Sequence, residues 1–193
     1  MSQRRVFATL ALLAAVLALP AASQTPGAAR RAGVGFVDWQ AATVATRRAA
    51  NQSLGRVDRA AVDRTAVPIL LPDDAALLAN ARLYSFGDYY SLTADLPGAG
   101  VSFTGTTAVV ALPDRSPLRI DATAPELLTV QRTVDGQLAS FVRFGVLYTV
   151  ELRCDDPADP RCRNEALVRQ LVASANRVVM GQAARQAAAG QGG

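Results

Sequence analysis

The sequence predicts an α+β fold, an antiparallel meander of about five to six strands with a C-terminal helix packed on one face. Three observations lead to this prediction. Residues 138–154, LASFVRFGVLYTVELRC, alternate apolar and mixed positions, which is the period-two pattern of a strand with one face on a core. Short β-branched and aromatic runs precede this segment and are separated by Pro- and Gly-containing turns. Apolar residues at helical spacing follow it, between residues 160 and 180.

A single domain is expected over residues 67–181. Pro68 and Pro72 bracket a short extended edge segment at residues 69–71. The pair Asp73-Asp74 is expected to cap one helical turn over residues 75–80. Further strands are predicted over residues 81–86, 89–96, 101–112 and 118–122, with turns at 97–100 and 113–117 and a bulge or bend at Gly105.

Residues 126–134 and 138–154 form the clearest hairpin pattern. The dipeptide Asp135-Gly136 suggests a two-residue type I′ turn, which would place Val130 opposite Phe141 and mix the two faces. A three-residue loop over residues 135–137 instead places Val130 opposite Val142, Val134 opposite Leu138 and Leu128 opposite Phe144. Because a one-residue slip turns a core face to water, we predict the three-residue loop or an adjacent bulge.

The last element is predicted to be one helix that begins at Pro160 and ends before Gly181. Asp159 offers an N-cap, a proline suits the first helical position, and a glycine is a natural stop. The apolar stripe of this helix should lie on the sheet. Cys154 and Cys162 fit a disulfide in an oxidising compartment, with free buried thiols as the alternative. The disulfide would tie the first helical turn to the end of the long strand.

Residues 1–23 are predicted to be a secretory signal peptide. Arg4 and Arg5 form its charged region, an apolar run covers residues 6–19, and small residues precede Gln24. The apolar run is shorter than the ~20 residues of a spanning helix, so cleavage is favoured over an uncleaved anchor. No later segment is apolar enough to span a membrane. We therefore expect a periplasmic or secreted protein.

Residue composition and net charge indicate the kind of organism that the chain comes from and argue against one class of binding partner. The chain has 20 basic residues, all of them Arg, and the abundance of Ala without Lys is typical of a GC-rich bacterial genome, consistent with a Gram-negative bacterium. The net charge of +4, which falls to +2 without the signal peptide, is too small to indicate nucleic-acid binding. Residues 24–66 are expected to be a flexible or arm-like segment, in which Phe36, Val37 and Trp39 could pack on the core. A loose helix around residues 40–52 is the alternative, and residues 182–193 are expected to be a disordered tail.

The absence of two residue types excludes several chemistries. Without His, the chain has no Ser-His or Cys-His pair and no histidine metal site, and without Lys it has no Ser-Lys dyad, Schiff base or P-loop. Carboxylate-pair chemistry remains open through Glu126, Glu151 and Glu165, although a solvated face with local ion pairs is favoured. The acidic loop Asp155, Asp156 and Asp159 is interpreted as a capped turn rather than a calcium site. No metal or cofactor is expected.

The best candidate for a ligand or partner surface is aromatic. Its residues are Tyr84, Phe86, Tyr89 and Tyr90, near Phe103, together with the mixed strand face that carries Phe141, Arg143 and Leu147. The leading hypothesis is a non-enzymatic periplasmic binding or scaffolding protein that acts on an envelope protein or a small apolar ligand. One alternative is a carboxylate-based hydrolase of cell-wall glycan. The other is an accessory subunit of an assembly or secretion complex whose partner pairs with a sheet edge.

Overall fold

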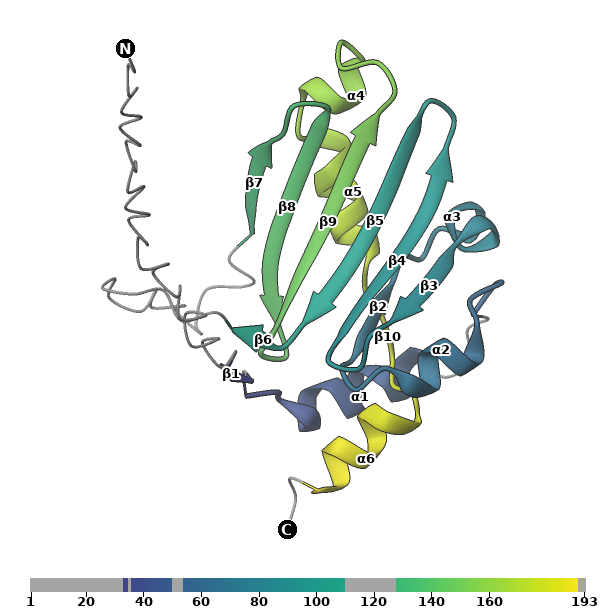
Figure 1. The fold of residues 1–193 in the computed structure, drawn as a ribbon, viewed down its shortest axis with the longest axis vertical. Coiled ribbons are helices and arrows are strands. Elements are labelled where there is room, and N and C mark those ends of the chain that lie inside the picture. Colours follow the sequence, from purple (N-terminus) through teal and green to yellow (C-terminus); the bar gives the residue numbers. More distant parts are fainter. Residues whose placement is uncertain (1–32, 35, 50–53, 110–127, 191–193) are drawn as a thin grey trace, which may run out of the picture. The chain divides into compact units, whose positions relative to one another are not determined.

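The computed structural model describes residues 33–34, 36–49, 54–109 and 128–190, all within the unit formed by residues 31–193. Its central element is a six-stranded antiparallel sheet with the strand order β3-β4-β5-β9-β8-β7 (Figure 1). The expected α+β class is therefore confirmed. The strands are β3 (Arg82–Ser85), β4 (Tyr89–Leu96), β5 (Ala99–Thr106), β7 (Thr129–Arg132), β8 (Gly136–Arg143) and β9 (Val146–Cys154).

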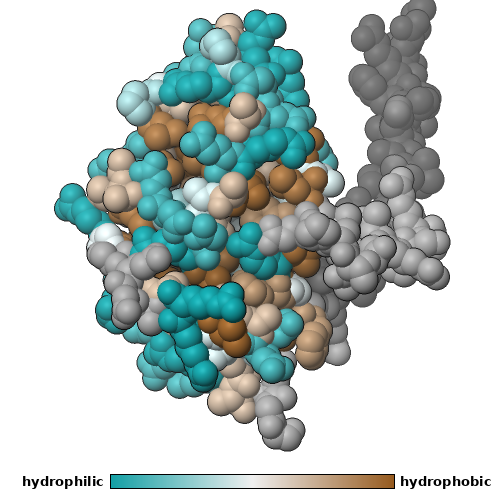
Figure 2. All heavy atoms as spheres, turned by 180° about the vertical axis from the view of Figure 1, so that it is seen from behind, coloured by the Kyte–Doolittle hydropathy of each residue, from teal (hydrophilic) through white to brown (hydrophobic). Residues whose placement is uncertain are grey.

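One face of this sheet is covered. Helix α5 (Ala166–Ser174) packs on β8 and β9, and a two-stranded sheet of β2 (Ile69–Leu71) and β10 (Arg177–Val179) lies beside it, behind the sheet in Figure 1. Seen from this side, hydrophobic residues show between hydrophilic ones over the middle of the surface (Figure 2). The other elements are β1 (Gly33–Val34), α1 (Trp39–Ala49), α2 (Arg59–Arg64), α3 (Ala75–Asn80), β6 (Ala108–Val109), α4 (Pro160–Arg163) and α6 (Gln182–Gly190).

The core consists of side-chain rows that cross the covered face. One row takes a residue from every strand of the six-stranded sheet: Leu83, Leu92, Phe103, Val150, Ala139 and Val130. The neighbouring row places Gly105 between Tyr90 and Tyr148, both of which are fully buried. The Tyr90 hydroxyl accepts the Leu70 N–H at 2.9 Å, and the Tyr148 hydroxyl donates to the Pro68 carbonyl at 2.8 Å. These two bonds attach the strand β2 segment to the main sheet.

The predicted long strand over residues 138–154 is instead a hairpin. Strand β8 ends at Arg143 and strand β9 begins at Val146, joined by Phe144 and Gly145, which both have positive φ of 55° and 72°. This is the backbone of a two-residue type I′ turn. A residue at position 145 must also be glycine because a Cβ there would collide with the Phe36 carbonyl oxygen. The even-numbered positions are buried along β9, as expected, but the turn shifts the phase so that odd positions are buried along β8.

The three-residue loop predicted over residues 135–137, between β7 and β8, is also wrong, because its prediction assumed the other face of β8 to be buried. Val130 pairs with Ala139 and Arg132 with Gln137, and the Thr133 N–H donates to the Gly136 carbonyl oxygen. The loop at the tip of this hairpin therefore consists of two residues, Val134 and Asp135. Val134 is 95% exposed rather than opposite Leu138. The hydrophobic pattern was matched to the wrong face of β8, because the intervening reversal at residues 144–145 was not recognised. The structure shows no bulge at Gly105, since both of its neighbours on β4 and β9 pair in unbroken register.

The predicted C-terminal helix is divided into three elements. It begins at Pro160 with Asp159 as N-cap, as expected, but α4 ends at Arg163, and Asn164 accepts the Ala166 N–H at the start of α5. Helix α5 lies on the sheet, yet the chain leaves it at Ala175 and continues as strand β10. The apolar residues of β10 are buried in a strand that pairs with β2, and not on the face of a helix. The spacing of apolar residues in so short a segment does not distinguish a helix from a strand.

The structure also describes parts of the chain outside the expected domain of residues 67–181, and these parts form helices α1, α2 and α6. Val37 is buried in the core, whereas Phe36 is 82% exposed, and α1 supplies the helix that sequence left as an alternative. The tail prediction is wrong for residues 182–190, which form α6, because Ala184 packs against Ala42 and Met180. The signal peptide and the strand expected over residues 118–122 lie outside the described residues.

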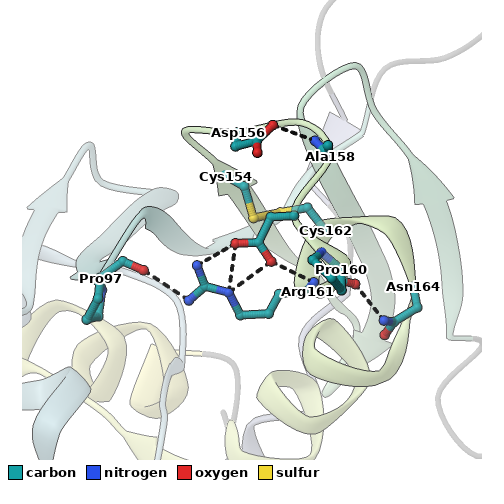
Figure 3. A network of polar contacts seen from close by, with 9 residues as sticks. Pro97, Cys154, Asp156, Ala158, Pro160, Arg161, Cys162 and Asn164 are labelled. Carbon is teal, nitrogen blue, oxygen red and sulfur yellow. Dashed lines mark hydrogen bonds and ion pairs between the residues drawn. A yellow bond between two sulfur atoms is a disulfide. The ribbon is translucent and has the colours of Figure 1, made fainter.

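The corner between β9 and α4 is closed by the expected Cys154–Cys162 disulfide (Figure 3). Arg161 donates to the carboxylate of Asp159 and to the Pro97 carbonyl oxygen at 3.0 Å. The hydrogen bonds from Arg161 lower the pKa of Asp159. This network attaches the turn between β4 and β5 to the disulfide loop, so the acidic loop serves as a capped turn.

Candidate binding surface

The second face of the six-stranded sheet carries no described helix and faces the viewer in Figure 1. Antiparallel sheets commonly leave one face to water, and side chains alternate accordingly along each strand. The strand register joins one residue from each strand into a line that we call the hydroxyl row. In order from β3 to β7 it consists of Tyr84, Ser91, Thr104, Thr149, Ser140 and Thr129. With about 4.8 Å between strands, the row crosses about 24 Å of sheet.

The hydroxyl row is a line of neutral hydrogen-bonding groups. At its centre, the Oγ1 atoms of Thr104 and Thr149 lie 2.6 Å apart. At its β7 end, the Thr129 hydroxyl donates to the Ser140 carbonyl oxygen at 3.4 Å. Each hydroxyl can donate one bond and accept others, so these groups retain capacity for a bound partner. None of the six residues is fully buried.

The charges on and beside this face are balanced. Arg82 pairs with Asp95 at 3.4 Å, and Arg153 pairs with Asp135 at 2.6 Å. The hydrogen bond from Arg153 lowers the pKa of Asp135. Glu151 also interacts electrostatically with Arg153. The face therefore presents no strong single-sign field to a charged partner.

Three of the predicted aromatic residues meet at one corner of this face, which we call the aromatic corner. Tyr84 and Phe86 are 49% and 63% exposed, and the rings of Phe86 and Tyr89 lie 5.5 Å apart between centroids. Strand pairing places Tyr84 opposite Ser91, two residues along β4 from Tyr89. The corner therefore continues directly from the β3 end of the hydroxyl row.

The other predicted surface residues lie on the covered face. Tyr90 and Phe141 are buried, and burial raises the pKa of the Tyr90 phenol. Arg143 lies 5.4 Å above the Phe141 ring and donates to the Ala175 carbonyl oxygen at the end of α5. A cation is favourable at a helix C-terminus, so Arg143 attaches α5 to β8. These residues and Leu147 do not form one patch, because the turn before Val146 places Leu147 on the open face instead.

Of the three candidate glutamates, Glu126 lies outside the described residues, and Glu151 faces no carboxylate on the neighbouring strands. The cross-strand neighbours of Glu151 are Ser102 and Leu138. In the acidic loop, Asp156 accepts the Ala158 N–H and Asp159 caps α4. Within the described residues, no group of three or more His, Cys, Asp or Glu side chains could hold a metal ion.

The hydroxyl row itself was not recognised from the sequence. The alternation of Ser and Thr is visible in residues 89–96 and 101–106, but the row exists only through the register of six strands. No helix of the described segments has the length and hydrophobicity needed to cross a membrane. No protein-family model, no curated protein and no solved structure matches this chain.

Proposed function

We propose that this chain is an exported, non-enzymatic protein that binds a neutral, extended glycan on the open face of its sheet. The observation that carries the proposal is the hydroxyl row, which ends in the aromatic corner. The disulfide fits an oxidising compartment outside the cytoplasm, and the predicted signal peptide would deliver the chain there. The absence of His and Lys from the sequence favours binding over catalysis.

The chemistry of the face suits a glycan better than the other partners considered. A sugar chain presents neutral hydroxyl groups along its length and apolar C–H faces on its rings. The former match the hydroxyl row and the latter can stack on exposed aromatic rings. Protein interfaces are depleted in Ser, and a small apolar ligand requires an enclosed apolar pocket rather than a flat polar row. Because the protein would act outside the cytoplasm, cell-wall glycan is the proposed polymer.

Retention on insoluble cell-wall sacculi tests this proposal, with chitin and cellulose as further glycans. We expect the mature protein to sediment with at least one of these polymers. The double variant Thr104→Val/Thr149→Val removes two hydroxyls while keeping β-branched side chains. Each lost hydrogen bond is worth about 0.5–1.5 kcal/mol, so affinity should fall about tenfold. The variant Phe86→Ala should weaken retention by a similar factor.

The matched control is Phe36→Ala, which removes an exposed aromatic ring from the segment before α1, a residue that belongs to no strand of the six-stranded sheet. Retention of this variant should equal that of the wild type. The proposal fails if no glycan retains the protein, or if the open-face variants and the control bind equally well. Circular dichroism of each variant establishes that a loss of binding does not reflect unfolding.

A further inference from the structure

The open face carries a second line of side chains directly beside the hydroxyl row, which we call the apolar row. It lies two residues further along each strand, toward the turn that joins β8 and β9, so about 7 Å separates the two lines. In order from the end of β3 to β8, the apolar row consists of Phe86, Tyr89, Thr106, Leu147 and Val142.

The apolar row presents mainly carbon to the open side of the sheet. Phe86 and Leu147 are 63% and 43% exposed, and the rings of Phe86 and Tyr89 lie 5.5 Å apart between centroids. The Thr106 hydroxyl already accepts the Ala108 N–H at 3.0 Å. The Tyr89 phenol is the other polar side-chain group of this row, so a ligand meets ring and methyl carbons along most of its length.

The opposite flank of the hydroxyl row is polar. Two residues along each strand in that direction, the register joins Arg82, Thr93, Ser102, Glu151, Leu138 and Gln131. Leu138 is the one apolar member of this flank. A ligand that lies along the hydroxyl row therefore has hydrogen-bonding groups on one side and carbon on the other.

We infer that the glycan bound on this face is N-acetylated and places acetamido methyl groups on the apolar row. This inference rests on the proposed function and names the class of sugar. In a β-1,4-linked chain the substituent on C2 extends sideways, and successive sugars are turned over, so every second C2 substituent points to the same side. The apolar row can remove an acetamido methyl group from water, and the amide can bond to the hydroxyl row. A C2 hydroxyl would instead lie against carbon and lose hydrogen bonds to water, which is unfavourable.

The test compares two soluble pentasaccharides, N-acetylchitopentaose and cellopentaose, by titration calorimetry of the mature protein. Both have the same β-1,4-linked backbone and no charge, and they differ only in carrying an acetamido group or a hydroxyl at C2. We expect the N-acetylated pentasaccharide to bind at least about fourfold more tightly, which corresponds to the burial of one methyl group.

Two variants locate the origin of this preference. The double variant Val142→Thr/Leu147→Thr places hydroxyls in the apolar row while keeping residues that are common in strands. The ratio of the two affinities should fall toward one, because the N-acetylated pentasaccharide loses its apolar contact. Val142→Thr alone, which nearly preserves shape, serves the same purpose if the double variant does not fold. The matched control is Leu138→Thr, a similar exchange in β8 on the polar flank, which should keep the wild-type ratio.

The outcomes separate this inference from the proposed function. Equal affinities, a preference for cellopentaose, or a preference that Leu138→Thr removes and the double variant keeps would overturn the inference and leave glycan binding in place. Absence of binding by both pentasaccharides would also overturn it. If cell-wall sacculi, chitin and cellulose then fail to retain the protein as well, the proposed function fails with it.

Discussion

Gly105 offers a direct test of how the core is assembled. It lies in β5 with two tyrosine rings over it, and a Cβ at this position would stand 2.5 Å from Cε1 of Tyr90 and 2.8 Å from Cε1 of Tyr148. Neither ring can move away easily, because their hydroxyls are bonded to the backbone at Leu70 and Pro68. The substitution Gly105→Ala should therefore force two buried rings apart or break these bonds.

The expected magnitude follows from two opposing effects. Inserting a methyl group into a close-packed core typically costs about 1–3 kcal/mol. Replacing glycine by alanine also reduces the entropy of the unfolded chain, which stabilises the folded state by about 0.4–1 kcal/mol where the backbone is compatible. The net destabilisation of Gly105→Ala should be about 1–2 kcal/mol. For a domain of this size, that lowers the melting temperature by roughly 2–8 °C.

Urea unfolding followed by circular dichroism measures this difference. The matched control is Gly100→Ala in the same strand, because a Cβ at that position meets no atom within 4 Å. The control should be as stable as the wild type or slightly more stable. If Gly105→Ala is also as stable as the wild type, the tyrosine rings do not constrain this position and the reasoning is refuted.

Two further predictions concern the corner between β9 and α4. Replacing Cys154 and Cys162 by alanine should lower the free energy of unfolding by about 2.5 kcal/mol in urea, from the entropy of closing a loop with a sequence separation of 8; an unchanged value would contradict this. For Asp159, whose pKa is lowered by Arg161, the charge stabilises the fold above the ordinary pKa of 3.8, and this contribution is lost as pH falls through the lower folded value. Melting temperatures of Asp159→Asn, which retains a capping oxygen, should thus fall less than those of wild type between about pH 5 and pH 2, and parallel curves would exclude the effect.

Predictions from the sequence were confirmed where the interactions that form an element lie within one short segment of the chain. Asp74 and Asp159 cap their helices as expected, because a capping side chain bonds to backbone groups only two or three residues away. Strand β4 has the predicted bounds, since its alternation and flanking turns lie within a few residues. The disulfide was predictable for the same reason, because its loop is short.

The candidate site was predictable only in part. Tyr84, Phe86 and Tyr89 lie together because neighbouring strands in sequence also pair in space. Tyr90 is adjacent to Tyr89 in sequence but points to the opposite face, as alternation along a strand requires. Phe141 and Arg143 were assigned to the wrong face because the phase of β8 depends on the reversal at Phe144, a residue type that rarely adopts positive φ.

The α+β class, the strand over residues 89–96, the helix caps and the cysteine pairing could be predicted from the amino-acid sequence, because their signals lie in residues close together in the chain. Long-range packing determines which face of β8 is buried, that residues 177–179 form a strand, and that residues 182–190 form a helix. These outcomes depend on partners far away in sequence, such as β2 for β10 and Ala42 for α6. The hydroxyl row belongs to this second group, because it exists only where six strands lie in register.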